Sequence, residues 1–122
     1  MSVLIVDDEE GLRESLKEFL EEEGYRVATA TNGAEALALL EHDVLPCMMI
    51  LDLIMPMVTG GEVYRQMQND PRLAQIPVII STSDPTRAPR GVLILRKPIS
   101  LEQLLGAVRL HCGMHGPSRT TH

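Results

Sequence analysis

Five short apolar runs, separated by segments with helical periodicity, constrain the fold of this 122-residue chain more than any other feature. Each run has only three or four residues, which is typical of a strand that is buried on both faces. The runs are Val3–Val6, Val27–Ala30, Met48–Leu51, Val78–Ile80 and Val92–Leu95. Because strands that alternate with helices form a parallel sheet through right-handed crossovers, the pattern predicts an α/β, doubly wound parallel sheet.

The helices between these strands carry recognisable start and stop signals. Leu12, Leu16, Phe19 and Leu20 form one apolar stripe, and Gly24 follows in the usual position for ending a helix. Three later segments begin with a residue that can cap a helix, followed three positions on by Glu or Gln. These starts are Asn32-x-x-Glu35, Thr59-x-x-Glu62 and Ser100-x-x-Gln103. The chain therefore has helices after its first, second, third and fifth strands.

The interval between the fourth and fifth strands is too short for this pattern. Only fourteen residues, Ser83 to Arg96, separate the end of the fourth strand from Lys97. A helix, a strand and two connections would need roughly 20 or more. Pro85 and Pro89 also interrupt the segment, and proline is excluded from a helix interior. We expect the fourth helix to be short or missing.

Composition narrows the class of protein. A net charge of −6 argues against a nucleic-acid binder, because phosphate contacts need clustered Lys and Arg. No apolar run approaches the ~20 residues of a membrane span, and no leader precedes the first strand, so we expect a cytoplasmic chain without a membrane partner.

One domain over residues 1–112 and a disordered tail over 113–122 are predicted. Cys47 and Cys112, far apart in the sequence, are expected to be reduced thiols.

Chemically active side chains stand at four of the predicted strand ends. Asp7 and Asp8 follow the first strand, Asp52 the third, Thr82 the fourth and Lys97 the fifth. With the strand order 2-1-3-4-5, all of them converge on one crevice at the carboxyl edge of the sheet. Clustered carboxylates repel one another unless a cation compensates, and oxygen-only ligands favour Mg²⁺. Beside Mg²⁺, a carboxylate can act as a nucleophile toward phosphorus, with Lys97 and Thr82 facing the phosphoryl oxygens.

Four motifs follow one another along the chain: Val6-Asp7-Asp8, Asp52 with Pro56 and Gly60 behind it, Pro77–Thr82, and Lys97-Pro98. In this order they resemble the receiver domain of two-component response regulators, over about residues 2–110. The resemblance implies a flavodoxin-like fold. It also implies a signalling role rather than an enzymatic one, beyond self-catalysed phosphorylation and dephosphorylation.

Particular roles follow from the same resemblance. Asp52 would accept phosphate from a sensor histidine kinase or a phosphotransfer protein. Asp8, Asp52 and the Ile54 carbonyl would bind Mg²⁺ directly, and Asp7 would act through water. The Thr82 hydroxyl would turn toward the phosphate and Lys97 would pair with it. The Lys97–Pro98 peptide would be cis. The chain would then signal through contacts with an unidentified protein partner, with no output domain and no direct contact to nucleic acid.

Departures from the family pattern favour a second hypothesis. Receivers usually carry an aromatic residue three positions before the lysine, where this chain has Ile94. Together with the short 83–96 segment, this suggests a pseudo-receiver, a scaffold that binds partners independently of phosphorylation. A third hypothesis, a small phosphatase or flavin protein, is disfavoured by Ile54 two residues after Asp52. The acids that follow the first strand also disfavour it, because they would repel a phosphate.

Overall fold

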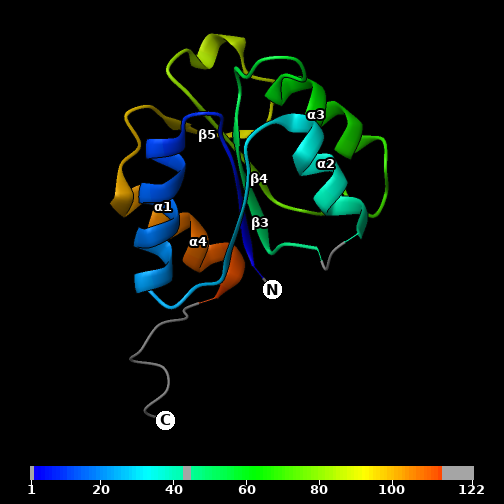
Figure 1. Cartoon of the computed structure of the whole chain (residues 1–122). Coiled ribbons are helices and arrows are strands. Elements are labelled where there is room, and N and C mark those ends of the chain that lie inside the picture. Colours follow the sequence, from blue (N-terminus) through cyan, green and yellow to red (C-terminus); the bar gives the residue numbers. More distant parts are fainter. Residues whose placement is uncertain (1, 43–44, 114–122) are drawn as a thin grey trace.

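The computed structural model describes residues 2–42 and 45–113, which build a five-stranded parallel sheet in the order β2-β1-β3-β4-β5 (Figure 1). The predicted fold class and strand order are thus confirmed. The strands are β1 (Val3–Val6), β2 (Val27–Ala30), β3 (Met48–Asp52), β4 (Val78–Thr82) and β5 (Leu93–Arg96). Every residue of β1, β3 and β4 is buried, as expected for strands with helices on both faces.

Two helices cover each face of the sheet (Figure 1). On one face, α1 (Glu10–Glu22) and α4 (Leu101–Cys112) pack against the sheet, and on the other face α2 (Gly33–His42) and α3 (Gly60–Gln68) do so. The predicted caps are present. The side chains of Asn32, Thr59 and Ser100 accept hydrogen bonds from the backbone three residues on. At Thr59 the capping box is complete, since Glu62 also accepts from the Thr59 backbone.

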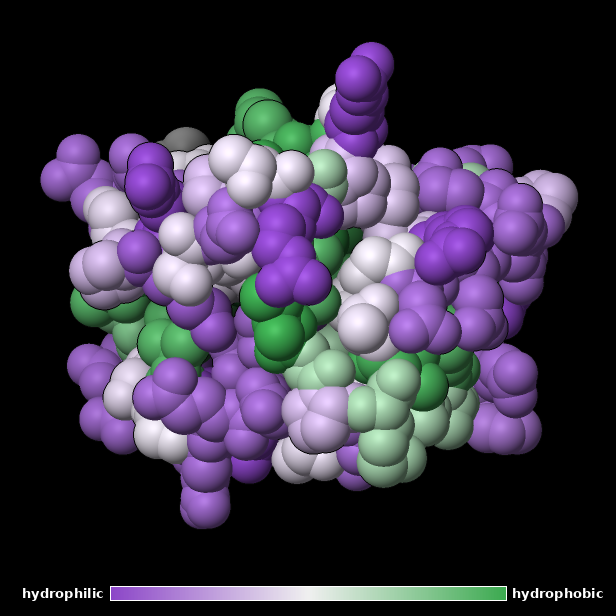
Figure 2. All heavy atoms as spheres, turned by 90° about the horizontal axis from the view of Figure 1, so that it is seen from above, coloured by the Kyte–Doolittle hydropathy of each residue, from purple (hydrophilic) through white to green (hydrophobic). Residues whose placement is uncertain are grey.

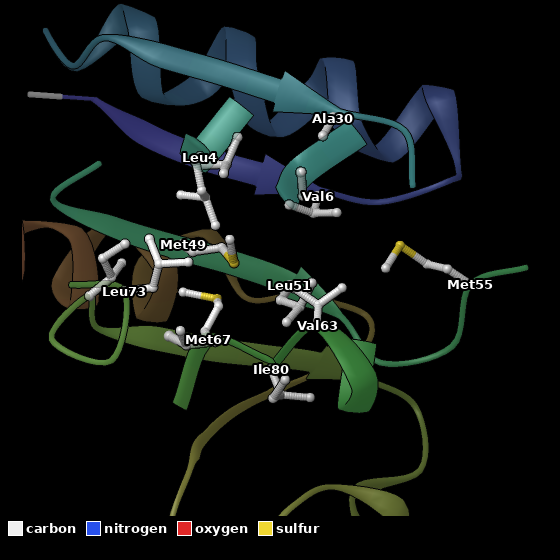
Figure 3. Close-up of a cluster of buried hydrophobic side chains, with 14 of the residues drawn as sticks. Leu4, Val6, Ala30, Met49, Leu51, Met55, Val63, Met67, Leu73 and Ile80 are labelled. Atoms are coloured by element: carbon white, nitrogen blue, oxygen red, sulfur yellow. The ribbon is translucent and has the colours of Figure 1, made fainter. Parts of the chain in front are cut away.

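The sheet divides the core into two apolar clusters. The cluster under α2 and α3 includes Met49, Leu51, Val63, Met67 and Ile80, whose side chains interdigitate between β3, β4 and α3 (Figure 3). The cluster under α1 and α4 receives the alternate residues of the same strands, among them Ile5, Ile50, Ile79 and Leu95. This alternation decides which strand-end side chains share a face, because successive residues of a strand point to opposite sides.

The connection between β4 and β5 contains no α-helix, which confirms the expectation of a short or missing fourth helix. A single 3₁₀ turn, Pro85–Arg87, replaces it, and the Asp84 side chain caps that turn. Ala88 and Val92 pack against the cluster under α2 and α3. Ile94, on the same face of β5, is still 37% exposed, and Leu93, on the opposite face with Leu95, is 58% exposed.

The expectation of two reduced thiols was wrong, because Cys47 and Cys112 form a disulfide with their Cα atoms 5.3 Å apart. Cys47 immediately precedes β3 and Cys112 ends α4. The 65 residues between them suggested distance in space. The parallel topology instead brings the start of β3 and the end of α4 together at the amino edge of the sheet, where both belong to one apolar cluster. Separation along the chain is therefore a poor guide to cysteine pairing here.

The described part of the chain ends at Gly113, which caps α4 by donating its backbone N–H to the Arg109 carbonyl. The Gly113 carbonyl accepts a hydrogen bond of 2.6 Å from the Tyr25 hydroxyl. The rest of the predicted tail, residues 114–122, lies outside the described residues. Within the described part of the chain, no helix combines the length and apolar composition that a membrane span needs.

Candidate acidic phosphoacceptor site

Lys97 joins two of the predicted carboxylates at the carboxyl edge of the sheet. Its Nζ lies 3.3 Å from Asp7 Oδ2 and 3.4 Å from Asp52 Oδ1. Both acids are buried, at 2% and 5% exposed, and the lysine side chain is 23% exposed. Val6 pairs with Leu51, so Asp7, the residue after β1, lies beside Asp52, the last residue of β3. Parallel pairing thus assembles the ion pairs from three separate strand ends.

Asp8 completes a cluster of three carboxylates. One oxygen from each of Asp7, Asp8 and Asp52 lies within 4.8 Å of the others, and Asp8 is exposed while its neighbours are buried. Mg²⁺ prefers a few carboxylate oxygens with waters completing its octahedron, so the donor set fits this ion and the exposed Asp8 leaves an open side for water. Ile54 follows with an exposed side chain. Its carbonyl as a further ligand stays a prediction.

The carboxyl edge is the face seen from above in Figure 2. Hydrophilic side chains dominate this face, and hydrophobic ones gather in separate clusters between them. A hollow of about 490 Å³ opens beside Lys97, lined by Glu9, Leu12, Ser83, Lys97, Pro98 and Ile99. Its lining joins the start of α1 to the segment after β5, so a partner that entered it would lie next to the ion pairs.

The turn after β1 is held in place by Asp7. Its Oδ1 accepts a hydrogen bond from the Glu9 backbone at 2.8 Å, and its carbonyl accepts one from Arg13 Nη1, also at 2.8 Å. Arg13 is 9% exposed. Our sequence reading missed it, although its positions three and seven residues before Leu16 and Leu20 place it on the inner side of α1. Arg13 ties the start of α1 to the end of β1, and the Glu9 N–H orients the Asp7 side chain.

The loop after Asp52 folds back onto β3. Met57 adopts the left-handed region with φ 68°, which is uncommon outside glycine. Gly60 then donates its backbone N–H to the Leu53 carbonyl at 2.9 Å, which brings the start of α3 directly against the end of β3. The Pro56 and Gly60 spacing in the sequence thus corresponds to a tight return of the chain beside the site.

Thr82 lies at the end of β4, but its hydroxyl faces the following loop. The Asp84 backbone donates a hydrogen bond to Thr82 Oγ1 at 3.0 Å. Thr82 shares its face of β4 with Val78 and Ile80, whereas Asp52 shares the opposite face with Ile50. The hydroxyl would have to leave Asp84 to serve a phosphoryl group on Asp52.

The Lys97 backbone is fixed by a hydrogen bond to β4. Its N–H donates to the Thr82 carbonyl at 2.9 Å, which prolongs the β4–β5 pairing by one residue. The Lys97–Pro98 peptide is cis, as the family resemblance implied. The Lys97 side chain reaches back across the sheet to Asp7 and Asp52.

Burial and repulsion from Asp7 make Asp52 a weaker acid than an ordinary aspartate. Desolvation, followed by the charge of Asp7, raises the pKa of Asp52 from 3.8 to about 6, although Lys97 opposes the shift. For Lys97, burial pulls the pKa down, but the charges of Asp52 and Asp7 outweigh it and raise the pKa above 10.5. The lysine thus stays charged throughout the physiological range, while Asp52 responds to neighbouring cations and protons.

This shift predicts a pH dependence of stability. A carboxyl whose pKa is higher in the folded than in the unfolded chain binds its proton more tightly when folded. Without divalent cations, the chain therefore gains stability as pH falls from about 7 toward 4, and the ionised Asp52 carboxylate at pH 8 costs about 3 kcal/mol. Asp52→Asn should stabilise the chain by about this amount at pH 8 and by almost nothing at pH 4. Urea unfolding of both proteins at the two pH values measures the difference. A difference independent of pH would contradict the assignment.

Known structures share the fold of this chain. A chemotaxis response regulator of Vibrio cholerae, CheY4, superposes with a TM-score of 0.79 at 28% identity, covering 90% of this chain and 97% of that one. The signal receiver domain of a histidine kinase from Syntrophus aciditrophicus reaches 0.80 at 34% identity, covering 92% and 90%. The fold and the acidic pocket are those of a signalling receiver.

The family model described as the response regulator receiver domain matches residues 3–109, and the chain belongs to this family. Response regulator Rre1 of Synechocystis is 40% identical over 84 residues, which are 68% of this chain and 36% of that protein. Response regulator MprA of Mycobacterium leprae is 34% identical over 116 residues, 89% of this chain and 50% of that protein. The chain thus spans about half or less of the length of these relatives.

Family membership carries several coarse properties. Receiver domains belong to two-component systems, act as signalling domains rather than classical enzymes, and bind Mg²⁺ at an acidic pocket. They interact with histidine kinases or phosphotransfer proteins. The aspartate cluster of this chain has the composition that such a pocket requires.

Proposed function

We propose that this chain is a phosphoacceptor receiver and that Asp52 is the residue phosphorylated. The observation that carries the proposal is the pair of contacts from Lys97 Nζ to Asp52 and Asp7. A buried carboxylate flanked by a second acid and a lysine has a nucleophilic oxygen and, within hydrogen-bonding distance, a positive charge for the incoming phosphoryl oxygens. The phosphoryl donor is a sensor histidine kinase or a phosphotransfer protein.

In the transfer, one Asp52 oxygen forms the bond to phosphorus while the bond from phosphorus to the donor nitrogen breaks. Asp8, Asp52 and the Ile54 carbonyl would hold Mg²⁺, with Asp7 acting through water. The bound ion would offset the negative charge that gathers in the pocket. Lys97 moves its contact from the carboxylate to the phosphoryl oxygens. Thr82 exchanges Asp84 for the phosphoryl group, and this exchange couples the site to the 83–92 segment.

The signal leaves through protein contacts on this remodelled segment and the exposed side chains of β5. Phosphorylation of Asp52 adds up to two negative charges at the end of β3, beside the end of β4, which favours a rearrangement of the loop that Thr82 and Asp84 anchor. Residues 1–112 form the receiver unit in this proposal. Its place of action is the cytoplasm, where histidine kinases present their phosphoryl groups.

Mass spectrometry after treatment with acetyl phosphate tests the proposal. The wild type should gain one phosphoryl group only with Mg²⁺ present, and Asp52→Asn should gain none because it lacks the nucleophilic oxygen. Glu102→Gln, an exposed acid in the first turn of α4, is the matched control and should be labelled like the wild type. An unlabelled wild type, or equal labelling of Asp52→Asn, would refute the assignment.

A pseudo-receiver scaffold is the second candidate, and one observation favours it. The hydroxyl expected to sense phosphate is already bonded to Asp84, and the side chain three residues before Lys97 is the partly exposed Ile94. A scaffold would keep this arrangement whatever the state of Asp52. Partner binding separates the two candidates, because a scaffold binds its partner through residues 83–96 equally well with Asp52→Asn, whereas a switching receiver does not.

A further inference from the structure

A second hydroxyl, that of Ser81, lies buried next to the candidate site with no assigned role. Ser81 is 1% exposed, and among the described residues its Oγ has no hydrogen-bond partner. Buried hydroxyls are nearly always paired, since desolvating one without compensation is unfavourable. Most neighbours on its face of the sheet are apolar, including Ile79 and Leu95. A purely structural position here would favour an apolar side chain.

The register places Ser81 directly beside Asp52. The two residues are partners in the β3–β4 pairing, and Leu53 N–H donates to the Ser81 carbonyl at 3.0 Å. Both leave their strands on the face covered by α1 and α4, because Ile50 and Ile79, two residues before each, belong to the same cluster. Neighbouring strands lie about 5 Å apart, so a rotation of the Ser81 side chain brings its hydroxyl within reach of the Asp52 carboxylate.

The Lys97 side chain reaches the site on the same face of the sheet as this hydroxyl. Ser81 is also the register partner of Leu95 on β5, two residues before Lys97. To reach Asp52 from the end of β5, the lysine side chain must cross the end of β4. The last residue of β4 on that face is Ser81, since Thr82 lies on the opposite one. The Lys97 side chain therefore passes the end of β4 on the face that Ser81 occupies.

We propose that Ser81 is a positioning residue that donates a hydrogen bond to the Asp52 oxygen not bonded to phosphorus. This deepens the proposed function and rests on it. Asp52 uses one oxygen as the nucleophile, and the other needs a donor that fixes the carboxylate plane once Lys97 turns to the phosphoryl oxygens. Thr82 is engaged on the far side of β4, so the two hydroxyls serve different oxygens. The Ser81 hydroxyl orients the Asp52 carboxylate, and the Thr82 hydroxyl binds the phosphoryl group after transfer.

Four substitutions at position 81 test this role. Ser81→Ala removes the hydroxyl without adding volume, while Ser81→Thr and Ser81→Val have nearly the same shape and differ in the hydroxyl. The rate of phosphoryl uptake from acetyl phosphate with saturating Mg²⁺ should fall about tenfold in the Ala and Val variants, the value of one hydrogen bond to a charged group. The Thr variant should keep most of the wild-type rate. Ser81→Cys, a weak donor, should lie between them.

Unfolding by urea separates positioning from packing. Ser81→Ala should unfold at the same or a higher urea concentration than the wild type, because it removes an unpaired buried hydroxyl. A slower rate in a chain of undiminished stability identifies a positioning residue. Equal rates in the wild type and Ser81→Ala, or equal losses in the Thr and Val variants, would overturn the inference while leaving Asp52 as the acceptor. A wild type that takes up no phosphoryl group would overturn both proposals.

Discussion

Gly60→Ala is expected to destabilise the chain by about 3–4 kcal/mol, because the added Cβ has no room against backbone that is itself held by the sheet. A Cβ at this position would fall on the Asp52 carbonyl oxygen and lie 2.8 Å from Leu53 Cα. These are main-chain atoms at the end of β3, so no side-chain rotation relieves the overlap. Relief requires the start of α3 to move away from the strand that carries the candidate acceptor.

Gly61→Ala is the matched control, one residue further along the same helix. The nearest atom to its Cβ would be Thr59 Oγ1 at 3.8 Å, an ordinary contact. Alanine is also the better helix former, so this variant should be as stable as the wild type or slightly more stable. Urea unfolding compares the two. Equal stability of the Gly60 and Gly61 variants would show that the end of β3 yields easily, against the close approach described above.

Gly60→Ala should also weaken Mg²⁺ binding, measured in the folded protein by titration calorimetry. Displacing α3 moves the end of β3, which holds Asp52, relative to Asp8 after β1. Because Mg²⁺ demands near-ideal octahedral geometry, a shift of the carboxylates lowers affinity even when the fold survives. Gly61→Ala should bind Mg²⁺ like the wild type.

Opening the Cys47–Cys112 disulfide is expected to destabilise the chain by about 3–4 kcal/mol. The bond closes a loop of 65 residues that contains β3, α3, β4 and β5. It therefore removes much conformational freedom from the unfolded chain. It also secures the end of α4 to the start of β3. The double variant Cys47→Ala/Cys112→Ala should unfold at a correspondingly lower urea concentration.

A reductant supplies the control for this prediction. Added to the wild type, it should lower the unfolding midpoint to that of the double variant, and it should leave the double variant unchanged. A wild type indifferent to reductant, with both thiols reactive toward a thiol reagent beforehand, would contradict the bond. The carboxyl edge lies at the opposite end of the sheet, so reduction should lower stability more than it alters Mg²⁺ affinity.

Much of the fold could be predicted from the sequence because its signals are local. The apolar runs are short enough to be read only as strands, and each cap lies within three residues of the group it serves. The lost fourth helix is a matter of counting residues between Ser83 and Arg96. The candidate site could be predicted once the strands were placed, because a parallel sheet brings the residues after its strands to one edge. Asp7, Asp8, Asp52 and Lys97 accordingly lie together.

Only the tertiary structure decided which of these groups touch. Cys47 and Cys112 form a disulfide, although their separation in the sequence had suggested two reduced thiols. The Thr82 hydroxyl is hydrogen-bonded to the Asp84 backbone. The tertiary structure also left Ser81 buried beside Asp52 without a partner among the described residues. The physical reason is that local periodicity encodes an element and its buried face. A contact between residues 45 or 90 positions apart, such as those of Lys97, depends instead on how the faces pack, on register and on side-chain rotamers.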